Sequence, residues 1–212
     1  MAAEFLKRGW QVIGTVRGGK RTELHDLADE HPGRVEVETL DMTAPDEVAA
    51  LRERLAERTL DLLFINAGIA TDEPFARIEA VAPEEFSRVM LTNAYAPARV
   101  IAALQDRVPA DGLIGAMSSG QGSIANNTSG NNDAYRASKV ALNMLMQSFA
   151  ARDGDTRSFA LIAPGWIRTD LGGSKAPYTV EDTVPLVVDV LLAKRSRPGL
   201  EFLDRFGKTV PW

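Results

Sequence analysis

Short apolar, β-branched runs alternate with amphipathic segments along the whole chain, and this alternation constrains the fold more than any other feature. Such runs predict strands at residues 11–17, 34–42, 60–68, 112–119, 158–166 and 199–207. The segments between them predict helices at residues 2–10, 22–33, 44–58, 82–108 (one long helix or a kinked pair), 134–152 and 179–195. Strands alternating with helices form a parallel sheet covered on both faces, so we predict a doubly wound, three-layer α/β/α fold.

The chain of 212 residues is long enough to bury a core as one domain. It has no internal repeat, low-complexity tract or linker, so we expect a single domain over residues 1–212. Residues 60–68 are a nearly continuous apolar run, which predicts a strand buried on both faces.

Composition narrows the classes of function. The net charge of −5 argues against nucleic acid or an anionic membrane as the main partner. The absence of cysteine excludes disulfides, thiol catalysis and thiolate metal sites. His25 and His31 both lie in a polar predicted helix, so no metal site is expected. We find no bilayer-spanning run and no signal peptide, so we expect a cytoplasmic protein.

Ligands of doubly wound sheets bind outside the carboxyl ends of the strands, so the residues after each strand are the informative ones. Arg17 follows the first predicted strand, where a basic residue favours the 2′-phosphate of NADP and an acidic one the ribose diol of NAD. A solvated basic turn explains Arg17 equally well. Asp41 and Met42 follow the second strand, and Asp41 either bonds to an adenine amine or, as its position favours, caps the next helix.

The later strands end in small or hydroxyl-bearing residues. Asn66, Ala67 and Gly68 would let the backbone approach a ligand closely, with Asn66 bracing neighbouring strands. Ser118 and Ser119 end the fourth strand, but the chain lacks the G-x-S-x-G motif of a hydrolase. Pro164-Gly165 forms a turn after the fifth strand, and Thr169 could offer a hydroxyl to an amide-bearing ligand. Ordinary turns are the alternative at each position.

Tyr135 and Lys139 lie four residues apart at the start of a predicted helix and therefore project from one face. We expect the Lys139 ammonium to lower the Tyr135 pKa, so that the phenol exchanges a proton with a carbonyl or alcohol oxygen. Ser119 would hold the same oxygen, and Lys139 would also reach a nicotinamide ribose. The alternative is that Tyr135 and Lys139 are ordinary helix residues without a catalytic role, but the residues after the strands favour a catalytic pair.

In their order along the chain, these motifs resemble those of the short-chain dehydrogenase/reductase family. The resemblance rests on Asn66-Ala67-Gly68, the serine after the next strand, Tyr135-x-x-x-Lys139 and Pro164-Gly165, and it covers essentially the whole chain. Asn93, in "LTNAYAP", falls where the family places the asparagine of its catalytic tetrad. Residues 118–145, residues 163–184 and the ending "FLDRFGKTVPW" are similar to the C-factor and sniffer-type carbonyl reductases.

The resemblance implies a Rossmann-like NADP(H)-dependent carbonyl reductase, with NAD(H) the less favoured cofactor and no metal. Hydride would pass between nicotinamide and a small carbonyl or alcohol substrate. The implied catalytic residues are Asn93, Ser119, Tyr135 and Lys139, where the choice of Ser119 over Ser118 rests on the alignment and Asn93 anchors a water linking Lys139 to solvent. The implied cofactor-binding residues are Arg17, Asp41, Met42, Asn66, Ala67, Gly68, Tyr135, Lys139, Pro164, Gly165, Ile167 and Thr169.

The chain departs from the family at its beginning. The family starts with a strand and a T-G-x-x-x-G-x-G turn that binds pyrophosphate, whereas "MAAEFLKRGW" is similar to the middle of the following helix. We therefore expect an N-terminally truncated domain whose sheet lacks its first strand and has two unpaired edges. Met1 is expected to be an internal methionine of a longer protein; the alternative is a real truncation that pairs with another copy or segment.

Other functions stay open at this point. A non-catalytic signalling or interaction protein could keep the fold without a working cofactor loop. A sugar-nucleotide epimerase uses the same Tyr-Lys pair but needs a longer chain.

The substrate pocket is expected beside the loop after Ser119, residues 74–80 and the stretch after Thr169, with Trp166 and Tyr178 as an apolar wall. Family members often dimerise through the helices that correspond to those of Asn93 and Tyr135, which implies a homodimer.

Overall fold

The computed structural model describes residues 1–73, 75–152 and 156–212, so Pro74 in the expected pocket segment lies outside the described residues. The chain forms two compact units, Met1–Arg58 and Thr59–Trp212, each of which is described by itself. The expectation of a single domain stays a prediction.

The first unit is a parallel strand pair with three helices. Its elements are α1 (Ala2–Lys7), β1 (Val12–Val16), α2 (Glu23–Glu30), β2 (Val35–Thr39) and α3 (Pro45–Arg54). β1 and β2 pair in register from Val12 opposite Val35 to Val16 opposite Thr39. The Arg34 guanidinium donates to the carbonyls of Leu6 (3.0 Å) and Trp10 (2.9 Å), which fixes the connection from α1 into the strand.

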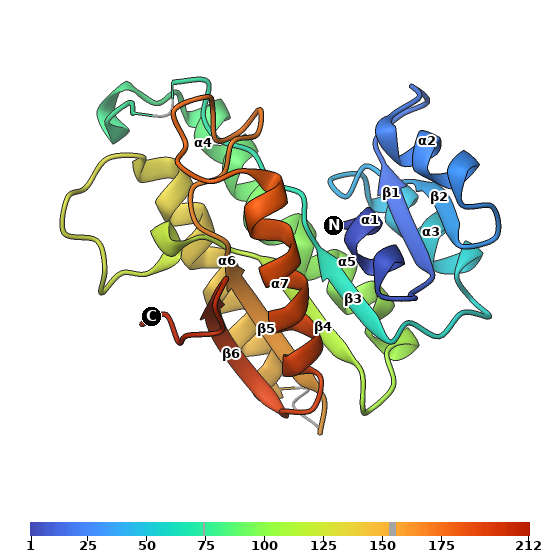
Figure 1. Cartoon of the computed structure of the whole chain (residues 1–212). Coiled ribbons are helices and arrows are strands. Elements are labelled where there is room, and N and C mark those ends of the chain that lie inside the picture. The colour runs from blue at the N-terminus through green and yellow to red at the C-terminus, as the bar shows by residue number, and fades with distance from the viewer. Residues whose placement is uncertain (74, 153–155) are drawn as a thin grey trace. The chain divides into compact units, whose positions relative to one another are not determined.

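The second unit contains a four-stranded parallel sheet in the order β3-β4-β5-β6 (Figure 1). Its strands are β3 (Leu62–Ile65), β4 (Leu113–Met117), β5 (Ser158–Ala163) and β6 (Gly199–Asp204). Its longer helices are α4 (Pro83–Met90), α5 (Ala96–Leu104), α6 (Asp133–Arg152) and α7 (Val180–Lys194). Figure 1 shows α7 on one face of this sheet and α5 and α6 on the other, which makes three layers.

Short helical turns join some of these elements. They are the 3₁₀ turns η1 (Ile78–Ala80), η3 (Gln105–Arg107) and η4 (Gly120–Gly122) and the π-helical turn η2 (Leu91–Tyr95). The predicted helix at 82–108 is thus α4 and α5 joined by η2 and followed by η3. None of the described helices combines the length and apolarity needed to cross a bilayer.

The predicted α/β class with parallel strands is confirmed, and the strands pair as two sheets rather than one. Burial follows position within each sheet. Every residue of the inner strand β5 is buried. In β3 only Leu63 is buried, so the expectation of burial on both faces is wrong there, because β3 is the edge strand of its sheet.

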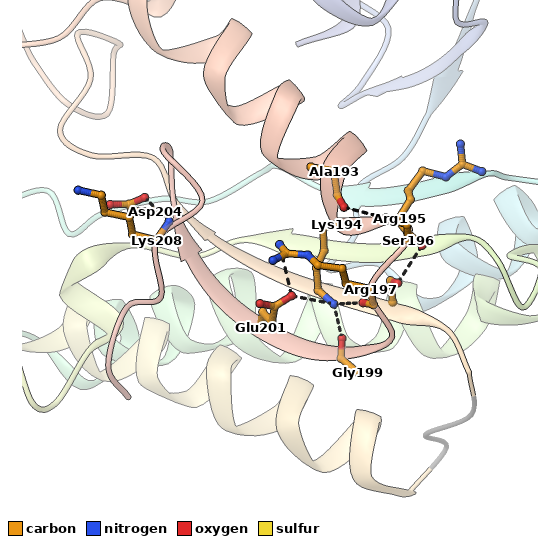
Figure 2. A network of polar contacts seen from close by, with 10 residues as sticks. Ala193, Lys194, Arg195, Ser196, Arg197, Gly199, Glu201, Asp204 and Lys208 are labelled. Atoms are coloured by element: carbon orange, nitrogen blue, oxygen red, sulfur yellow. Dashed lines mark hydrogen bonds and ion pairs between the residues drawn. The ribbon is translucent and has the colours of Figure 1, made fainter.

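A buried lysine anchors the turn between α7 and β6 (Figure 2). Lys194 is 0% exposed, and its Nζ donates to the carbonyls of Gly199 (2.8 Å) and Arg197 and pairs with Glu201 Oε2 at 3.1 Å. Burial lowers the Lys194 pKa, and the contact with Glu201 partly offsets this effect. The buried cation is thus compensated by two carbonyls and one carboxylate at this turn.

Candidate active site

Asn93 sits in the π-helical turn η2, fully buried at 0% exposure. Its amide nitrogen donates to the carbonyl of Ile69 (2.7 Å) and to Ser138 Oγ (3.0 Å), and its Oδ1 accepts from the N–H of Ile69 (2.8 Å). Pro97 has no N–H to offer the Asn93 carbonyl four residues earlier, which favours the wider π turn here. The side chain thereby joins α6 to the segment after β3.

Lys139 lies one turn along α6 from Tyr135 and is 3% exposed. Its Nζ donates to the carbonyl of Met117 at the end of β4 (2.9 Å) and lies 5.7 Å from the centroid of the Tyr135 ring. Burial lowers the pKa of Lys139 to about 8. The group can therefore lose a proton close to neutral pH.

Gly68 lies against both of these side chains. A Cβ on Gly68 would stand 3.3 Å from Asn93 Oδ1 and 3.3 Å from Lys139 Nζ. A larger residue would crowd both groups, so the small residue permits the close approach of Asn93 and Lys139 to this backbone. The expected approach of the same backbone to a ligand stays a prediction. Asn66 and Ala67 are exposed, and Asn66 makes no side-chain hydrogen bond within the described residues, so it does not brace the strands.

The Ser119 hydroxyl, which follows β4, acts on the pKa of the Tyr135 phenol. Burial raises the pKa of Tyr135, and the hydrogen bond with Ser119 opposes this rise. We expected Lys139 to lower this pKa, and the structure differs because burial dominates and the ammonium donates to Met117. The neutral phenol is consequently the favoured form.

Two further polar side chains, which sequence reasoning missed, hold this group in place. Buried Asn143 accepts from Ser118 Oγ (2.6 Å) and donates to the carbonyl of Gly122 (3.1 Å), tying the loop after β4 to α6. Ser138 accepts from Asn93 and donates to the carbonyl of Tyr135 (2.7 Å). Asn143 follows Lys139 by four residues and therefore lies on the same buried face of α6. A polar residue on a buried helix face was the signal by which the sequence could have shown Asn143 as part of the site.

The residues after β5 form a separate part of the site. Gly165 has φ +94°, and the isolated bridge between Ile167 and Tyr178 follows it. Thr169 Oγ1 accepts from the N–H of Gly172 (3.1 Å), so the hydroxyl closes a turn within this segment. Pro164, Gly165, Ile167 and Thr169 therefore lie after the carboxyl end of β5, as expected. Among the described residues, no hydrogen bond joins them to Tyr135.

In the first unit, Arg17 follows β1 and Asp41 and Met42 follow β2. Asp41 Oδ1 accepts from the N–H (2.9 Å) and hydroxyl (2.6 Å) of Thr43. These bonds lower the pKa of Asp41, with a smaller contribution from the charge of Arg17. The N-cap of α3 is Ala44, so the favoured capping role of Asp41 is wrong, because its carboxylate closes its own turn.

The described part of the chain contains no group of three or more His, Asp or Glu side chains arranged to hold a metal ion.

Comparisons with known proteins show which proteins this chain is similar to. A model of the family described as enoyl-(acyl carrier protein) reductase matches residues 1–184. The C-signal protein of Myxococcus xanthus is 32% identical over 157 residues, which cover 72% of this chain and 93% of that protein.

Several solved structures match the whole chain, and some of them contain NADP. A short-chain dehydrogenase/reductase of Burkholderia multivorans with bound NADP is 54% identical (TM-score 0.98), and 92% of that chain is covered. A carbonyl reductase of Pseudomonas aeruginosa PAO1 in complex with NADP is 33% identical (TM-score 0.90), again with 92% of that chain covered.

Proposed function

Because the chain belongs to the short-chain dehydrogenase/reductase family and is one of its oxidoreductases, we propose that it is an NADP(H)-dependent carbonyl reductase. Its substrate would be a small carbonyl compound or the corresponding alcohol. The observation that carries the proposal is the buried Lys139, whose Nζ lies 5.7 Å from the centroid of the Tyr135 ring. Asn93 is bonded to Ser138 beside Tyr135, and the Ser119 hydroxyl acts on the pKa of a phenol that burial keeps neutral. The two neighbours solved with NADP support the choice of cofactor.

Tyr135 would act as the acid in reduction and the base in oxidation. Burial keeps its phenol protonated at neutral pH, which is the form that donates a proton to a carbonyl oxygen. The Ser119 hydroxyl would bind the same oxygen and orient it toward the phenol. NADPH, when bound, supplies the hydride that reduces the carbonyl carbon.

Lys139 would serve the proton supply and bind the nicotinamide ribose. Its pKa of about 8 lets it both hold and release a proton near neutral pH. Asn93 would keep the neighbouring backbone fixed while anchoring the water that links Lys139 to solvent. The full set of bonds to Ile69 and Ser138 supports this positioning role.

The residues at the strand ends fit the cofactor. Arg17, exposed after β1, would bind the 2′-phosphate, and Asp41 and Met42 would contact the adenine. The backbone at Asn66, Ala67 and Gly68 would lie against the cofactor, with the small residues at 67 and 68 permitting a close approach. The residues proposed for the nicotinamide end are Pro164, Gly165, Ile167 and Thr169.

The decisive experiment is a titration of this chain with NADPH and, separately, NADH, followed by nicotinamide fluorescence. The proposal expects NADPH-selective binding, and Arg17→Ala should weaken NADPH binding while leaving NADH binding little changed. Absence of NADPH binding would refute the proposal and favour the alternative of a signalling or interaction protein without turnover.

The role of Tyr135 is tested by reduction of 4-nitrobenzaldehyde with NADPH. Tyr135→Phe removes only the hydroxyl and should lower kcat by at least about 100-fold, as expected for a general acid. Tyr95→Phe is the matched control, since Tyr95 is exposed on η2. Full turnover by Tyr135→Phe would overturn the assigned role.

A homodimer is part of the same proposal. Leu91, Tyr95, Met144 and Leu145 are 41%, 53%, 63% and 38% exposed on η2 and α6, the elements that carry Asn93 and Tyr135. Light scattering after size exclusion tests this, and Met144→Glu should reduce the mass of a dimer to that of a monomer. The cytoplasmic location stays a prediction.

A further inference from the structure

The segment between β5 and α7 forms a lobe that is tied mainly to itself; we call residues 166–178 the β5–α7 lobe (orange in Figure 1). Its neck is closed where the N–H of Arg168 donates to the carbonyl of Tyr178 (2.8 Å). Within it, the Trp166 indole donates to the carbonyl of Gly172 (2.8 Å). Among the described residues, the hydrogen bonds of this lobe stay inside it. Within the described part of the chain, hydrogen bonds from the lobe therefore do not tie it to the rest of the second unit.

Arg205 holds that neck from the next strand. It directly follows β6, and its guanidinium carbon lies 3.6 Å from the centroid of the Tyr178 ring and 4.7 Å from that of Phe206. Its Nη1 also donates to the carbonyl of Pro164 (3.3 Å), immediately before the lobe. Arg205 thus contacts Pro164, just before the lobe, and Tyr178, the last residue of the lobe.

Gly165 makes room for this arrangement. A Cβ on Gly165 would lie 2.3 Å from Arg205 Nη1, so a side chain there would require the guanidinium to shift. The guanidinium therefore occupies the space that a side chain at residue 165 would fill. The absence of that side chain and the stacked Tyr178 ring both point to Arg205 as the group that fixes this corner.

We propose that Arg205 is a positioning residue that latches the β5–α7 lobe through Tyr178 and Pro164. The inference rests on the proposed function, because Gly165, Ile167 and Thr169 in and beside this lobe are the residues proposed for the nicotinamide end of the cofactor. Arg205 acts through the lobe and touches no reacting atom. Its loss should weaken binding of cofactor and substrate more than it slows the chemical step.

The first test needs no cofactor. Lys175 is exposed in the lobe, so trypsin cleavage after Lys175 reports how often the lobe opens. A cation–π contact of this kind corresponds to about a 3- to 30-fold change in an equilibrium. Arg205→Met should speed cleavage after Lys175 by that factor, and Arg205→Lys, which keeps the charge but loses the planar stack, should fall between Arg205→Met and the wild type.

Two further variants make this test specific. Tyr178→Leu removes the stack but leaves the bond from Arg205 to the Pro164 carbonyl, so it should speed cleavage by no more than Arg205→Met. The double variant should add little to Arg205→Met, since the stack is already lost there. Arg99→Met is the matched control, because Arg99 makes the same kind of contact with the Tyr95 ring (5.5 Å to the centroid) but lies in α5, outside the lobe. Cleavage unchanged by Arg205→Met, or fully additive effects in the double variant, would overturn the latch. Circular dichroism separates lobe opening from global unfolding.

The second test measures function. With NADPH and 4-nitrobenzaldehyde, Arg205→Met should raise both KM values by about 3- to 30-fold while kcat changes less than threefold. A fall in kcat at unchanged KM would overturn the positioning role. If the wild type binds no NADPH, the proposed function fails, whereas the cleavage experiment still decides whether Arg205 latches the lobe.

Discussion

Replacing Lys139 by methionine should change how the stability of the fold depends on pH. The Lys139 ammonium is 3% exposed, and burial lowers its pKa from 10.5 to about 8. Below pH 8 both the folded and the unfolded chain carry the charge, so the folded state bears the full cost of burying it. Between pH 8 and pH 10.5 the unfolded chain binds more protons, and the free energy of unfolding therefore rises with pH.

The size of this effect follows from the two pKa values. One pKa unit corresponds to about 1.4 kcal/mol, so the whole interval amounts to about 3 kcal/mol. Of this, about 1 kcal/mol should appear between pH 7 and pH 9, a range in which most proteins can be handled. The sign is opposite to that of a carboxylate, whose stabilisation is lost as the pH falls.

Urea denaturation followed by far-UV circular dichroism at pH 7, 8 and 9 measures this directly. The quantity of interest is the free energy of unfolding of the wild type minus that of Lys139→Met, because all other titrating groups cancel in the difference. We expect this difference to increase by about 1 kcal/mol from pH 7 to pH 9, because the wild type gains stability relative to the variant. Constant effects of the substitution, such as the lost bond to the Met117 carbonyl, do not alter this slope.

Tyr135→Phe is the matched control, since it keeps the Lys139 ammonium and should keep the wild-type slope. Parallel pH curves for the wild type and Lys139→Met would refute the reasoning, because they would mean that the ammonium is not desolvated in the folded chain. A slope lost in both variants would mean that the phenol, rather than the lysine, controls the titration.

Three other substitutions test the packing around the site and the sheet. Gly68→Ala places a methyl 3.3 Å from Asn93 Oδ1 and Lys139 Nζ, so kcat should fall about tenfold while circular dichroism stays unchanged. Ser158→Ala removes the hydroxyl that donates to two carbonyls of the α7–β6 turn, and urea denaturation should show a loss of about 1–2 kcal/mol. Thr179→Ala removes the N-cap side chain of α7 and should lower the free energy of unfolding by about 1 kcal/mol in the same urea experiment. The rate of trypsin cleavage after Lys175 should stay unchanged in this variant.

The sequence predicted the strands and helices because hydrophobic period is a local property. Residues 134–152 and Asp133–Arg152 differ by a single residue, and the run at 158–166 contains β5. The π-helical turn at Asn93 could be expected only as a kink, since Pro97 marks the place but not the geometry.

The candidate site was predictable as a set of residues but not as a set of contacts. Tyr135 and Lys139 were recognised from their spacing, yet the direction of the Tyr135 pKa depends on burial by distant segments. Asn143 and Ser138 were missed because their partners, Gly122 and Asn93, are far along the chain.

By itself, the sequence determined the α/β class, the succession of strands and helices along the chain and the residue types after each strand, because these depend on local spacing and polarity. Only the tertiary structure decided which of these groups are desolvated and which side chains hold the others in place. Arg205 shows the difference, since its stacking on Tyr178 depends on how β6 ends beside β5. Burial and long-range contact arise when strands pair, and no local pattern in the sequence encodes them.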